Sequence, residues 1–427
     1  MREKSERLFY NVDWFLVALF VVLVIFGWMN IYSAVYDPEK SDIFNFSRLE
    51  SKQMVFAFVS VVLAIGILVI DTSFFTATAF FFYGGIVLLN IIVAFAGADL
   101  RGSHSWFKFG GFSLQPAEFA KWATALALAK FLSGRTKSDK LTDLAISAGI
   151  IALPVLIMIG LQNETGVALV FGALIVLLYR EGMIPGWLLL AGFISIAAVI
   201  VGIKYPGLFW WITGSFAAVA LLWFLLIRKK TALKAIIALC IVAYVAGLMY
   251  TSSWMINHMS EHQSGRIKVW LGLPVSQAML DRYDYNTKQS LIAIGSGGAW
   301  GKTYLNGTQT KFRFVPEQET DFIFCTVGEE WGFVGTTAVV LLYCMLILRL
   351  IVQAERQRSD FTRIYGYAVA AIFLFHLLVN VGMTIGLLPV IGIPLPFFSY
   401  GGSSLISFTI LLFIFIKLDS QRLLILR

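Results

Sequence analysis

Charged residues are scarce in this sequence, and hydrophobic residues are plentiful. Only 14% of its 427 residues are charged, whereas 59% are hydrophobic, and the mean hydropathy is +0.81. Soluble globular proteins carry about a quarter charged residues. The composition therefore excludes an ordinary soluble enzyme. It predicts a polytopic membrane protein in which residues 1–427 form a single integral membrane domain.

Cysteine and histidine are also rare. The three cysteines all lie in apolar runs, and the four histidines show no metal-ligand spacing. We therefore expect no disulfide framework and no zinc-type cluster. The net charge of +8 is carried by short loops between apolar runs, which favours membrane orientation over nucleic-acid binding.

Long apolar runs predict about twelve membrane-spanning helices and hence an all-α fold. A helix needs about 20 apolar residues to cross the hydrocarbon layer, and a helix pairs its own backbone groups within lipid. The predicted spans are 12–34, 54–71, 75–97, 115–133, 141–161, 166–180, 185–203, 208–227, 233–253, 324–350, 362–386 and 401–418.

Lysine and arginine orient these spans. If all twelve cross the membrane, the basic clusters fall on the side of the N-terminus, which the positive-inside rule assigns to the cytoplasm. Both termini are then cytoplasmic, and no sizeable soluble segment lies on that side, so we expect no ATP-driven machine and no nucleotide cofactor. Residues 208–253 must form an extra helix pair for Arg228-Lys229-Lys230 to join the other clusters. Those clusters are Arg135, Lys137 and Lys140; Arg180; Arg349, Arg356, Arg358 and Arg363; and Arg422 and Arg427.

Residues 254–323 form the one long polar stretch and are predicted to be a large extracytoplasmic loop. The stretch ends on Asp321, and an apolar run follows directly. A carboxylate at the lip of a span, where water meets lipid, is suited to chemistry on a lipid-borne substrate. Asp321 is therefore the leading candidate for a catalytic residue.

Charges also occur where the bilayer should be. Glu118 and Lys121 open the fourth span, after Gln115 and Pro116. They lie three residues apart and share one helix face. Charges inside a span are costly unless paired or hydrated, so they are functional candidates. The alternative is an interfacial ion pair that only orients the helix.

Three further basic residues and one acid lie on the predicted outer side. Glu164, in the polar break 162–166, either faces a cavity or belongs to a solvated turn. Arg48, Lys52 and Arg266 are candidates to line an anion site, although each alone is more often a surface charge.

Glycine and proline interrupt the chain in two places. Residues 386–404 contain three prolines and four glycines near membrane depth, where irregular backbone is tolerated only when it is buried or lines a cavity. This segment is predicted to line a cavity. Residues 294–303 resemble a phosphate-binding loop but carry Ser296 where that motif needs glycine. Their glycines more plausibly allow tight turns or a close approach to other chain.

Together these motifs resemble the SEDS family, the membrane proteins of shape, elongation, division and sporulation. Gly307-Thr-Gln309 favours the rod-shape branch of the family over its division branch. The segments that carry the resemblance are Gln115 to Lys121, Gln289 to Gly298, Gly307 to Gln309, Pro316 to Phe324, Gly328 to Glu330 and Gly386 to Ser404, which includes Ser403.

The resemblance implies a peptidoglycan glycosyltransferase that polymerises lipid II at the outer face of the bacterial inner membrane. It implies a class B penicillin-binding protein as the crosslinking partner, and Asp321 as the catalytic carboxylate. A divalent cation, magnesium or manganese, is the one cofactor that we expect. The candidate substrate-binding residues are Lys121, Glu118, Arg266, Lys52, Arg48, Gln115, Glu164, Gln289 and Ser403.

The sequence departs from the family pattern at several positions. Glu164 replaces the usual Asp of the polar break, Glu319 replaces a His before Thr320-Asp321, and Ser105 precedes Trp106 where relatives often have Arg. Most members have ten spans, and the pair 208–253 lies outside the matched motifs.

Two other functions fit some of the same features. A flippase for lipid-linked precursor would also need intramembrane charges and broken helices, but the candidate groups cluster on one face and no inverted repeat is visible. The third reading is a non-catalytic scaffold for a transpeptidase. Two assays separate the three functions: polymerisation of lipid II by the purified protein with its partner, and movement of labelled lipid in liposomes.

Overall fold

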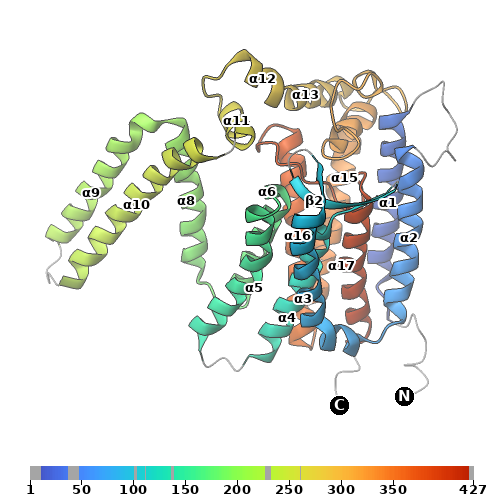
Figure 1. Cartoon of the computed structure of the whole chain (residues 1–427), viewed down its shortest axis with the longest axis horizontal. Coiled ribbons are helices and arrows are strands. Elements are labelled where there is room, and N and C mark those ends of the chain that lie inside the picture. Colours follow the sequence, from blue (N-terminus) through green and yellow to red (C-terminus); the bar gives the residue numbers. More distant parts are fainter. Residues whose placement is uncertain are drawn as a thin grey trace. The chain divides into compact units, whose positions relative to one another are not determined.

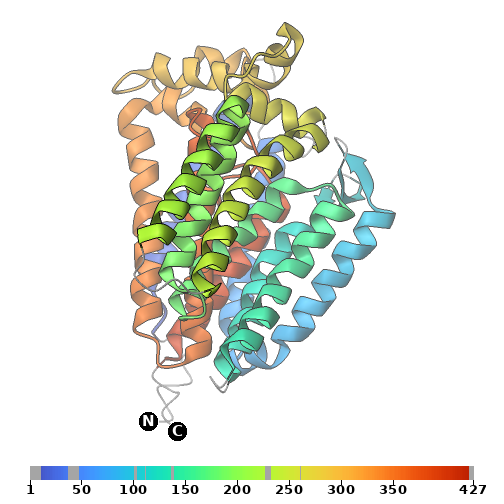
Figure 2. The same cartoon turned by 90° about the vertical axis from the view of Figure 1, so that its left-hand side faces the viewer.

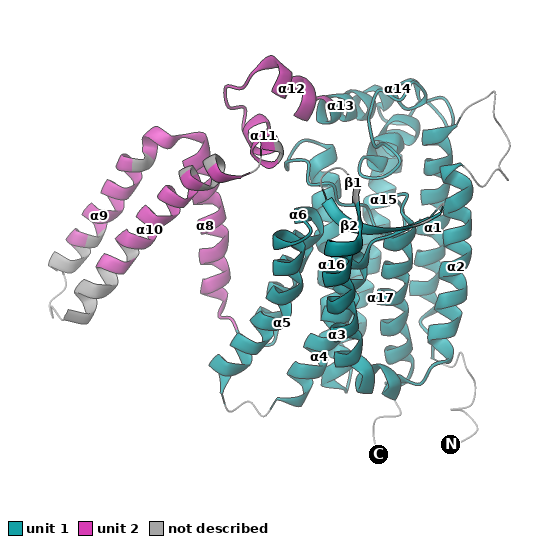
Figure 3. Ribbon diagram, in the orientation of Figure 1, with its two compact units in different colours: residues 1–183, 286–427 teal, residues 184–285 magenta. Residues whose placement is uncertain are grey.

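The computed structural model describes residues 11–36, 48–100, 103–110, 112–135, 139–226, 232–259 and 261–422. The chain divides into two compact units, shown in different colours in Figure 3. The first comprises residues 1–183 and 286–427, and the second comprises residues 184–285.

Each predicted span coincides with helix. In the first unit the corresponding helices are α1 (Trp14–Val35), α2 (Leu49–Val69), α3 (Thr72–Ala96), α4 (Pro116–Gly134), α5 (Lys140–Gly160), the chain of α6 (Thr165–Val170), η2 (Phe171–Ala173) and α7 (Leu174–Arg180), then α15 (Ile323–Glu355), α16 (Asp360–Thr384) and α17 (Gly402–Ser420). In the second unit they are α8 (Gly186–Lys204), α9 (Phe209–Leu226) and α10 (Ala232–His258).

Among the described residues, eight helices are long and apolar enough to cross a membrane. They are α1, α2, α3, α5, α8, α15, α16 and α17. The prediction of an all-α polytopic membrane protein is confirmed. Figure 1 shows the long helices of the first unit running roughly parallel.

The core of the first unit is built around α16 and α17. Most residues of both helices are buried, whereas α3 and α5 keep large apolar side chains such as Phe81, Phe95 and Leu156 exposed. Apolar exposure of this kind fits helices that face lipid. Figure 2 shows α3, α4 and α5, the blue-green helices, side by side at one flank.

The long polar stretch is not an open loop. Its first residues belong to α10, and helices α11 (Glu261–Trp270) and α12 (Gln277–Tyr283) follow in the second unit. Helices α13 (Tyr285–Gly297) and α14 (Thr308–Lys311) come next, so the stretch is divided between the two units. The predicted pair 208–253 corresponds to α9 and α10, which pack on each other and, in α10's case, on α8.

A small antiparallel sheet, which the sequence analysis does not predict, connects α3 to α4. It contains β1 (Ala98–Leu100), β2 (Ser103–Phe109) and β3 (Phe112–Leu114) in that order. Lys108 pairs with Ser113 across the hairpin of β2 and β3, and Gly110 at its turn has a φ of 57°. The last strand, β3, ends directly before Gln115, which is the residue before α4.

Helix α15 contains a break. Gly332 has a φ of 64° and a ψ of −158°, so the helix consists of two parts joined at this residue. This region of φ and ψ is open almost only to glycine. A Cβ at this position would lie 2.4 Å from the backbone nitrogen of Gly301, which explains how residues 297–303 approach the helix so closely.

The opposite ends of the first unit differ in character. At one end, Asp13 before α1 pairs with Arg349 at 2.7 Å, and Arg356 pairs with Asp419 at 3.0 Å. At the other end of α1, the Ser33 hydroxyl donates to Glu330 near the start of α15. The beginning of α1 and the end of α17 therefore share one end of the unit, and residues 318–330 lie at the other.

Candidate active site

Asp321 lies in the turn directly before α15 and is half-buried. Glu317 adopts a left-handed conformation, with a φ of 58°. Its carbonyl oxygen accepts hydrogen bonds from the N–H groups of Thr320 and Phe322, both at 3.2 Å. A non-glycine residue with positive φ is uncommon, so this turn is held by its surroundings rather than by local preference.

The predicted proline- and glycine-rich segment lies beside this turn. The N–H of Tyr400 donates to the carbonyl oxygen of Glu319 at 2.8 Å. A Cβ at Gly392 would lie 3.2 Å from Oδ2 of Asp321. Burial, and then the charge of Glu319, raise the pKa of Tyr400, so its hydroxyl group remains protonated at neutral pH.

Much of the same segment is inside the helix packing. Ile393, Leu395, Phe397, Phe398 and Ser399 are all buried. Because non-helical backbone cannot satisfy itself at membrane depth, its carbonyl groups need other partners. Side chains of α15 and α16 supply them.

Three side chains bond to backbone carbonyl groups of this segment. Asn380 Nδ2 donates to the Ile393 carbonyl at 2.8 Å, and the Tyr343 hydroxyl donates to that of Pro396. His376 Nδ1 lies 2.9 Å from the Pro394 carbonyl. A carbonyl oxygen can only accept, so Nδ1 carries the hydrogen and Nε2 of the neutral ring is an acceptor.

Glu118 and Lys121, which were predicted to share one helix face, form an ion pair on α4. Lys121 Nζ lies 2.7 Å from Glu118 Oε2, and both residues are only 2% exposed. Lys121 Nζ also lies 3.3 Å from His376 Nε2 and 4.2 Å from the centre of the Phe408 ring. A buried network thus runs from Glu118 through Lys121 and His376 to the segment beside Asp321.

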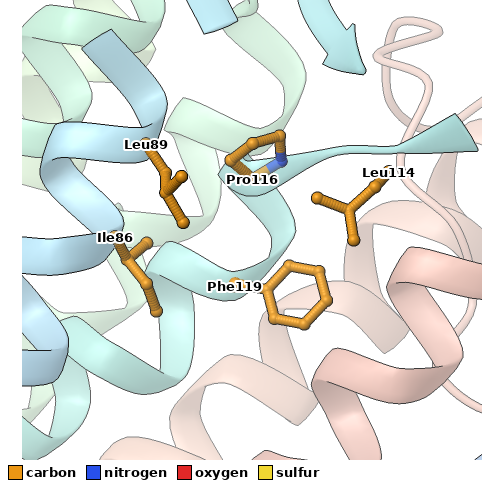
Figure 4. Close-up of a pocket in the computed structure, with 5 residues that line it drawn as sticks. All are labelled: Ile86, Leu89, Leu114, Pro116 and Phe119. Carbon is orange, nitrogen blue, oxygen red and sulfur yellow. The ribbon is translucent and has the colours of Figure 1, made fainter. Parts of the chain in front are cut away.

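Gln115 and Ser403 lie at a junction between elements. The N–H of Gln115 donates to Ser403 Oγ at 3.0 Å, and Ser403 Oγ lies 3.2 Å from the carbonyl oxygen of Ser113. Helix α17 is thereby tied to β3 and to the start of α4. An adjacent pocket has a volume of about 160 Å³, and its lining is wholly apolar. Figure 4 shows the lining residues Ile86, Leu89, Leu114, Pro116 and Phe119.

Glu164 also lies near the central segment. Its Oε2 accepts hydrogen bonds from the hydroxyls of Ser103 at 2.7 Å and Ser105 at 3.0 Å. Two residues later, a Cβ at Gly166 would lie 3.1 Å from the Ile391 carbonyl oxygen. The polar break 162–166 therefore joins β2 to the segment that touches Asp321.

The remaining candidates are less closely connected to Asp321. Arg48 pairs with buried Glu50 at 2.7 Å, and Gln289 is half-buried on α13. Within the part of the chain that the structure describes, the half-buried side chain of Lys52 has no hydrogen-bond or ion-pair partner. Arg266 lies on α11, in the second unit.

Comparison with known proteins agrees with this arrangement. Residues 13–209 and 212–423 match the sequence profile of the FtsW, RodA and SpoVE family, described as cell cycle proteins. The chain belongs to this family.

Relatives in the FtsW/RodA/SpoVE family are similar over most of their length. Peptidoglycan glycosyltransferase RodA of Treponema pallidum is 32% identical, covering 92% of this chain and 94% of that protein. Peptidoglycan glycosyltransferase MrdB of Escherichia coli K12 is 32% identical over 75% of this chain and 72% of its own. The predicted resemblance to the rod-shape branch is confirmed.

Solved structures of the family share the fold. A chain of a peptidoglycan synthase complex that coordinates polymerization and crosslinking matches with a TM-score of 0.70 at 26% identity, covering 96% of this chain and 98% of that one. The crystal structure of the Thermus thermophilus rod shape determining protein RodA matches with a TM-score of 0.58 at 26% identity, covering 96% and 97%.

The sequence analysis missed several residues around the family motifs. Asn380 and His376 were not candidates, although two polar residues four apart in an otherwise apolar helix are a signal of buried contacts. Glu329 belongs to the motif Gly328 to Glu330, but its structural role was not predicted. Its buried carboxylate accepts the N–H groups of Gln309 and Thr310, both at 2.8 Å, and pairs with Lys302 at 2.8 Å.

Within the described part of the chain, the expected divalent cation has no ready-made protein site. Among the described residues, no group of three or more His, Cys, Asp or Glu side chains is arranged to hold a metal ion. Magnesium is often held by one or two carboxylates together with substrate phosphates. The cation stays a prediction.

Proposed function

We propose that this chain polymerises lipid II into glycan strands for cell elongation and shape, with Asp321 as the general base. That the chain is a peptidoglycan glycosyltransferase agrees with the family and with the names of its relatives. The observation that carries the role of Asp321 is its position: half-buried, before α15, and in contact with the glycine- and proline-rich segment.

The chemistry requires one proton to move and one bond to break. The 4-hydroxyl of the acceptor sugar attacks the anomeric carbon of the donor, whose bond to the polyprenyl diphosphate breaks. Asp321 takes the hydroxyl proton, and the diphosphate leaves with the electron pair. A positioned general base contributes about 10²–10⁴-fold to the rate of such a step.

Cationic side chains would hold the leaving diphosphate. Lys52 is a candidate because its ammonium group has no partner among the described residues, and Arg266 stays a candidate from the second unit. Lys121 is enclosed and paired with Glu118. We propose that Lys121 supports the site from within the helix packing, since its charge is already neutralised there.

The membrane arrangement follows from charge. We propose that the chain lies in the bacterial inner membrane with both termini in the cytoplasm and Asp321 at the outer face. The ion pairs of Asp13 and Asp419 gather Arg349, Arg356 and Arg422 at the end where α1 begins and α17 ends. Concentrated arginine is the mark of a cytoplasmic side.

A class B penicillin-binding protein is the proposed partner, since a polymerised strand must be crosslinked. The similarity to a chain of a synthase complex that coordinates polymerization and crosslinking supports this assignment. Membrane lipids would surround the exposed apolar helices, and no nucleic acid is expected.

Polymerisation of lipid II in proteoliposomes tests the proposal. The wild-type chain, reconstituted with its transpeptidase partner, should elongate lipid II, and Asp321→Asn should abolish elongation while the protein remains folded. Asp281→Asn is the matched control, because Asp281 is an exposed acid of the same polar stretch whose carboxylate accepts a hydrogen bond from Gln277, one turn earlier on the same helix. Near wild-type elongation by Asp321→Asn would refute the role of Asp321, whereas movement of labelled lipid without polymerisation would favour a flippase.

A further inference from the structure

We propose that Asn380 is a positioning residue for Asp321, and that Asn380 and Gly392 together set the place of its carboxylate. This inference rests on the proposed function of Asp321 as general base. It adds two residues of other elements to that role. Asn380 belongs to α16, and Gly392 belongs to the segment between α16 and α17.

The amide group of Asn380 is enclosed by protein. The residue is 0% exposed on a helix whose neighbouring positions are mostly apolar. A buried amide is costly unless it is hydrogen-bonded. Its presence on a spanning helix therefore points to specific partners.

Those partners are two backbone carbonyl groups. Asn380 Nδ2 donates to the carbonyl oxygen of Asp321 at 2.9 Å and to that of Ile393 at 2.8 Å. An amide NH₂ group has two donors, so both are used. The orientation of the amide is also determined, because its oxygen could not face two carbonyl oxygens.

Gly392 lies close to the carboxylate of Asp321, whereas Asn380 bonds to its backbone. The φ of Gly392, 82°, lies in the left-handed region, and a Cβ there would stand 3.2 Å from Asp321 Oδ2. Asn380 donates to the carbonyl of Ile393, the residue that follows Gly392. The same amide thus fixes the backbone of the proposed base and the backbone against which its carboxylate rests.

Two further contacts keep this arrangement rigid. One helical turn before Asn380, His376 bonds to the carbonyl of Pro394 and lies 3.3 Å from Lys121. Tyr400 holds the carbonyl of Glu319. Asp321 is consequently fixed from α16, and so are the two residues that follow Gly392, Ile393 and Pro394.

Positioning has a kinetic signature that differs from substrate binding. A base displaced by about 1 Å can lose about 100-fold in rate, while the substrate still binds. Loss of the Asn380 donors should therefore lower kcat and leave the KM for lipid II nearly unchanged. A purely structural role would lower the folded fraction without this separation.

The first test replaces the amide by an apolar group of similar size. Asn380→Leu, in the full chain with its partner in proteoliposomes, should reduce kcat by about 10- to 100-fold and change the KM for lipid II less than twofold. Ser290→Ala is the control, because the buried Ser290 hydroxyl also donates to a backbone carbonyl of α16, that of Thr384 at 2.9 Å, and not to the carbonyl of Asp321. The control should retain near wild-type kcat at a similar apparent Tm.

The second test changes Gly392 instead of Asn380, and it remains decisive if Asn380→Leu does not fold. Gly392→Ala should lower kcat with KM unchanged. Gly386→Ala carries the same left-handed strain, with a φ of 74°, but its Cβ would face Thr287 at 3.4 Å instead of Asp321. It should lose stability to a similar degree and keep its kcat per folded molecule.

Three results are distinguishable. A fall in kcat for Asn380→Leu and Gly392→Ala, with both controls active, supports the positioning role. A kcat within twofold of wild type for Gly392→Ala and for folded Asn380→Leu overturns it, as does an equal loss in the controls. Failure of the wild-type chain to polymerise lipid II would instead refute the proposed function.

Discussion

Glu118 and Lys121 illustrate how charge is tolerated inside this molecule. Their side chains lie 2.7 Å apart and are almost fully buried. Other groups contact both residues. The backbone carbonyl of Glu118 accepts a hydrogen bond from the Ser407 hydroxyl at 2.6 Å, and the ammonium group of Lys121 lies against His376 and Phe408. The pair therefore behaves as one neutral unit within the helix packing.

Removal of one member should cost more than removal of both. An uncompensated buried charge costs about 3–5 kcal/mol, whereas replacement of a whole buried pair by apolar groups can be nearly neutral. Glu118→Gln should lower the apparent Tm in detergent strongly, and Lys121→Met in the same chain should recover part of the loss. Additive losses in this double-mutant cycle would contradict the coupling.

At the scale of elements, the buried carboxylate of Glu329 organises the segment before Asp321. It accepts the N–H groups of Gln309 and Thr310 at the beginning of α14, an arrangement that places negative charge where a helix presents free donors. Gln318 then connects this segment to α1, donating to the carbonyls of Thr310 at 2.8 Å and Ala34 at 2.7 Å.

Glu329→Ala should therefore loosen residues 302–313 without unfolding the chain. Three of these residues, Lys302, Lys311 and Arg313, are trypsin sites, and limited proteolysis read by mass spectrometry should show faster cleavage there. Glu355→Ala provides the control, because its ion pair with Arg180 is exposed, with side chains 46% and 51% accessible. Unchanged cleavage in Glu329→Ala would show that the segment is held by other contacts.

The break in α15 requires a glycine at position 332, and a substitution there tests this requirement. Gly332→Ala would place a Cβ 2.4 Å from the nitrogen of Gly301 in a conformation that costs about 1–3 kcal/mol for other residues. We expect a clear fall in apparent Tm. Gly149→Ala on α5, where a Cβ meets nothing within 4 Å, should be neutral or slightly stabilising. A similar Tm for both variants would contradict the proposed constraint.

At the scale of the whole molecule, the two ends of the first unit carry different chemistry. One end collects arginines in ion pairs with Asp13, Glu181 and Asp419. The other contains Asp321 and the exposed aromatic side chains of Trp300 and Phe333, which are 80% and 71% accessible. Aromatic residues favour membrane–water interfaces, in keeping with a membrane that lies between these two ends.

Cysteine labelling in intact cells tests the proposed orientation. In a background without Cys240, Cys325 and Cys344, Trp300→Cys should react with a membrane-impermeant maleimide. Asp360→Cys, whose position at the arginine-rich end is 58% exposed, should react only after the membrane is opened. The reverse pattern would place Asp321 in the cytoplasm and exclude polymerisation at the outer face.

Some features of this molecule follow from neighbouring residues and can be read without a structure. The helices were predicted because an apolar run of about 20 residues in lipid has no alternative to a helix. The contact of Glu118 with Lys121 was predicted because residues three apart share a helix face. The close approach of residues 297–303 was anticipated from their glycines, and Gly301 now accounts for it.

Other predictions were incomplete because the partners lie far apart in the chain. The strands β1, β2 and β3 lie between two predicted spans, and their pairing into a small sheet was not predicted. The segment 386–404 was expected to line a cavity, and its residues from Ile393 to Ser399 are largely core. The cavity itself stays a prediction, as do the substrate-binding roles of Arg48, Lys52, Gln115, Glu164, Arg266, Gln289 and Ser403.

The membrane class, the helices, the family and the candidacy of Asp321 could be read from the sequence, because composition, apolar run length and motifs are properties of consecutive residues. The surroundings of Asp321 depend instead on how the chain folds. Asn380, Gly392 and Tyr400 reach it or its neighbours from beyond α15. A buried backbone carbonyl needs a hydrogen-bond donor, which can come from any part of the folded chain. The residues next to that carbonyl in the sequence therefore do not identify its donor.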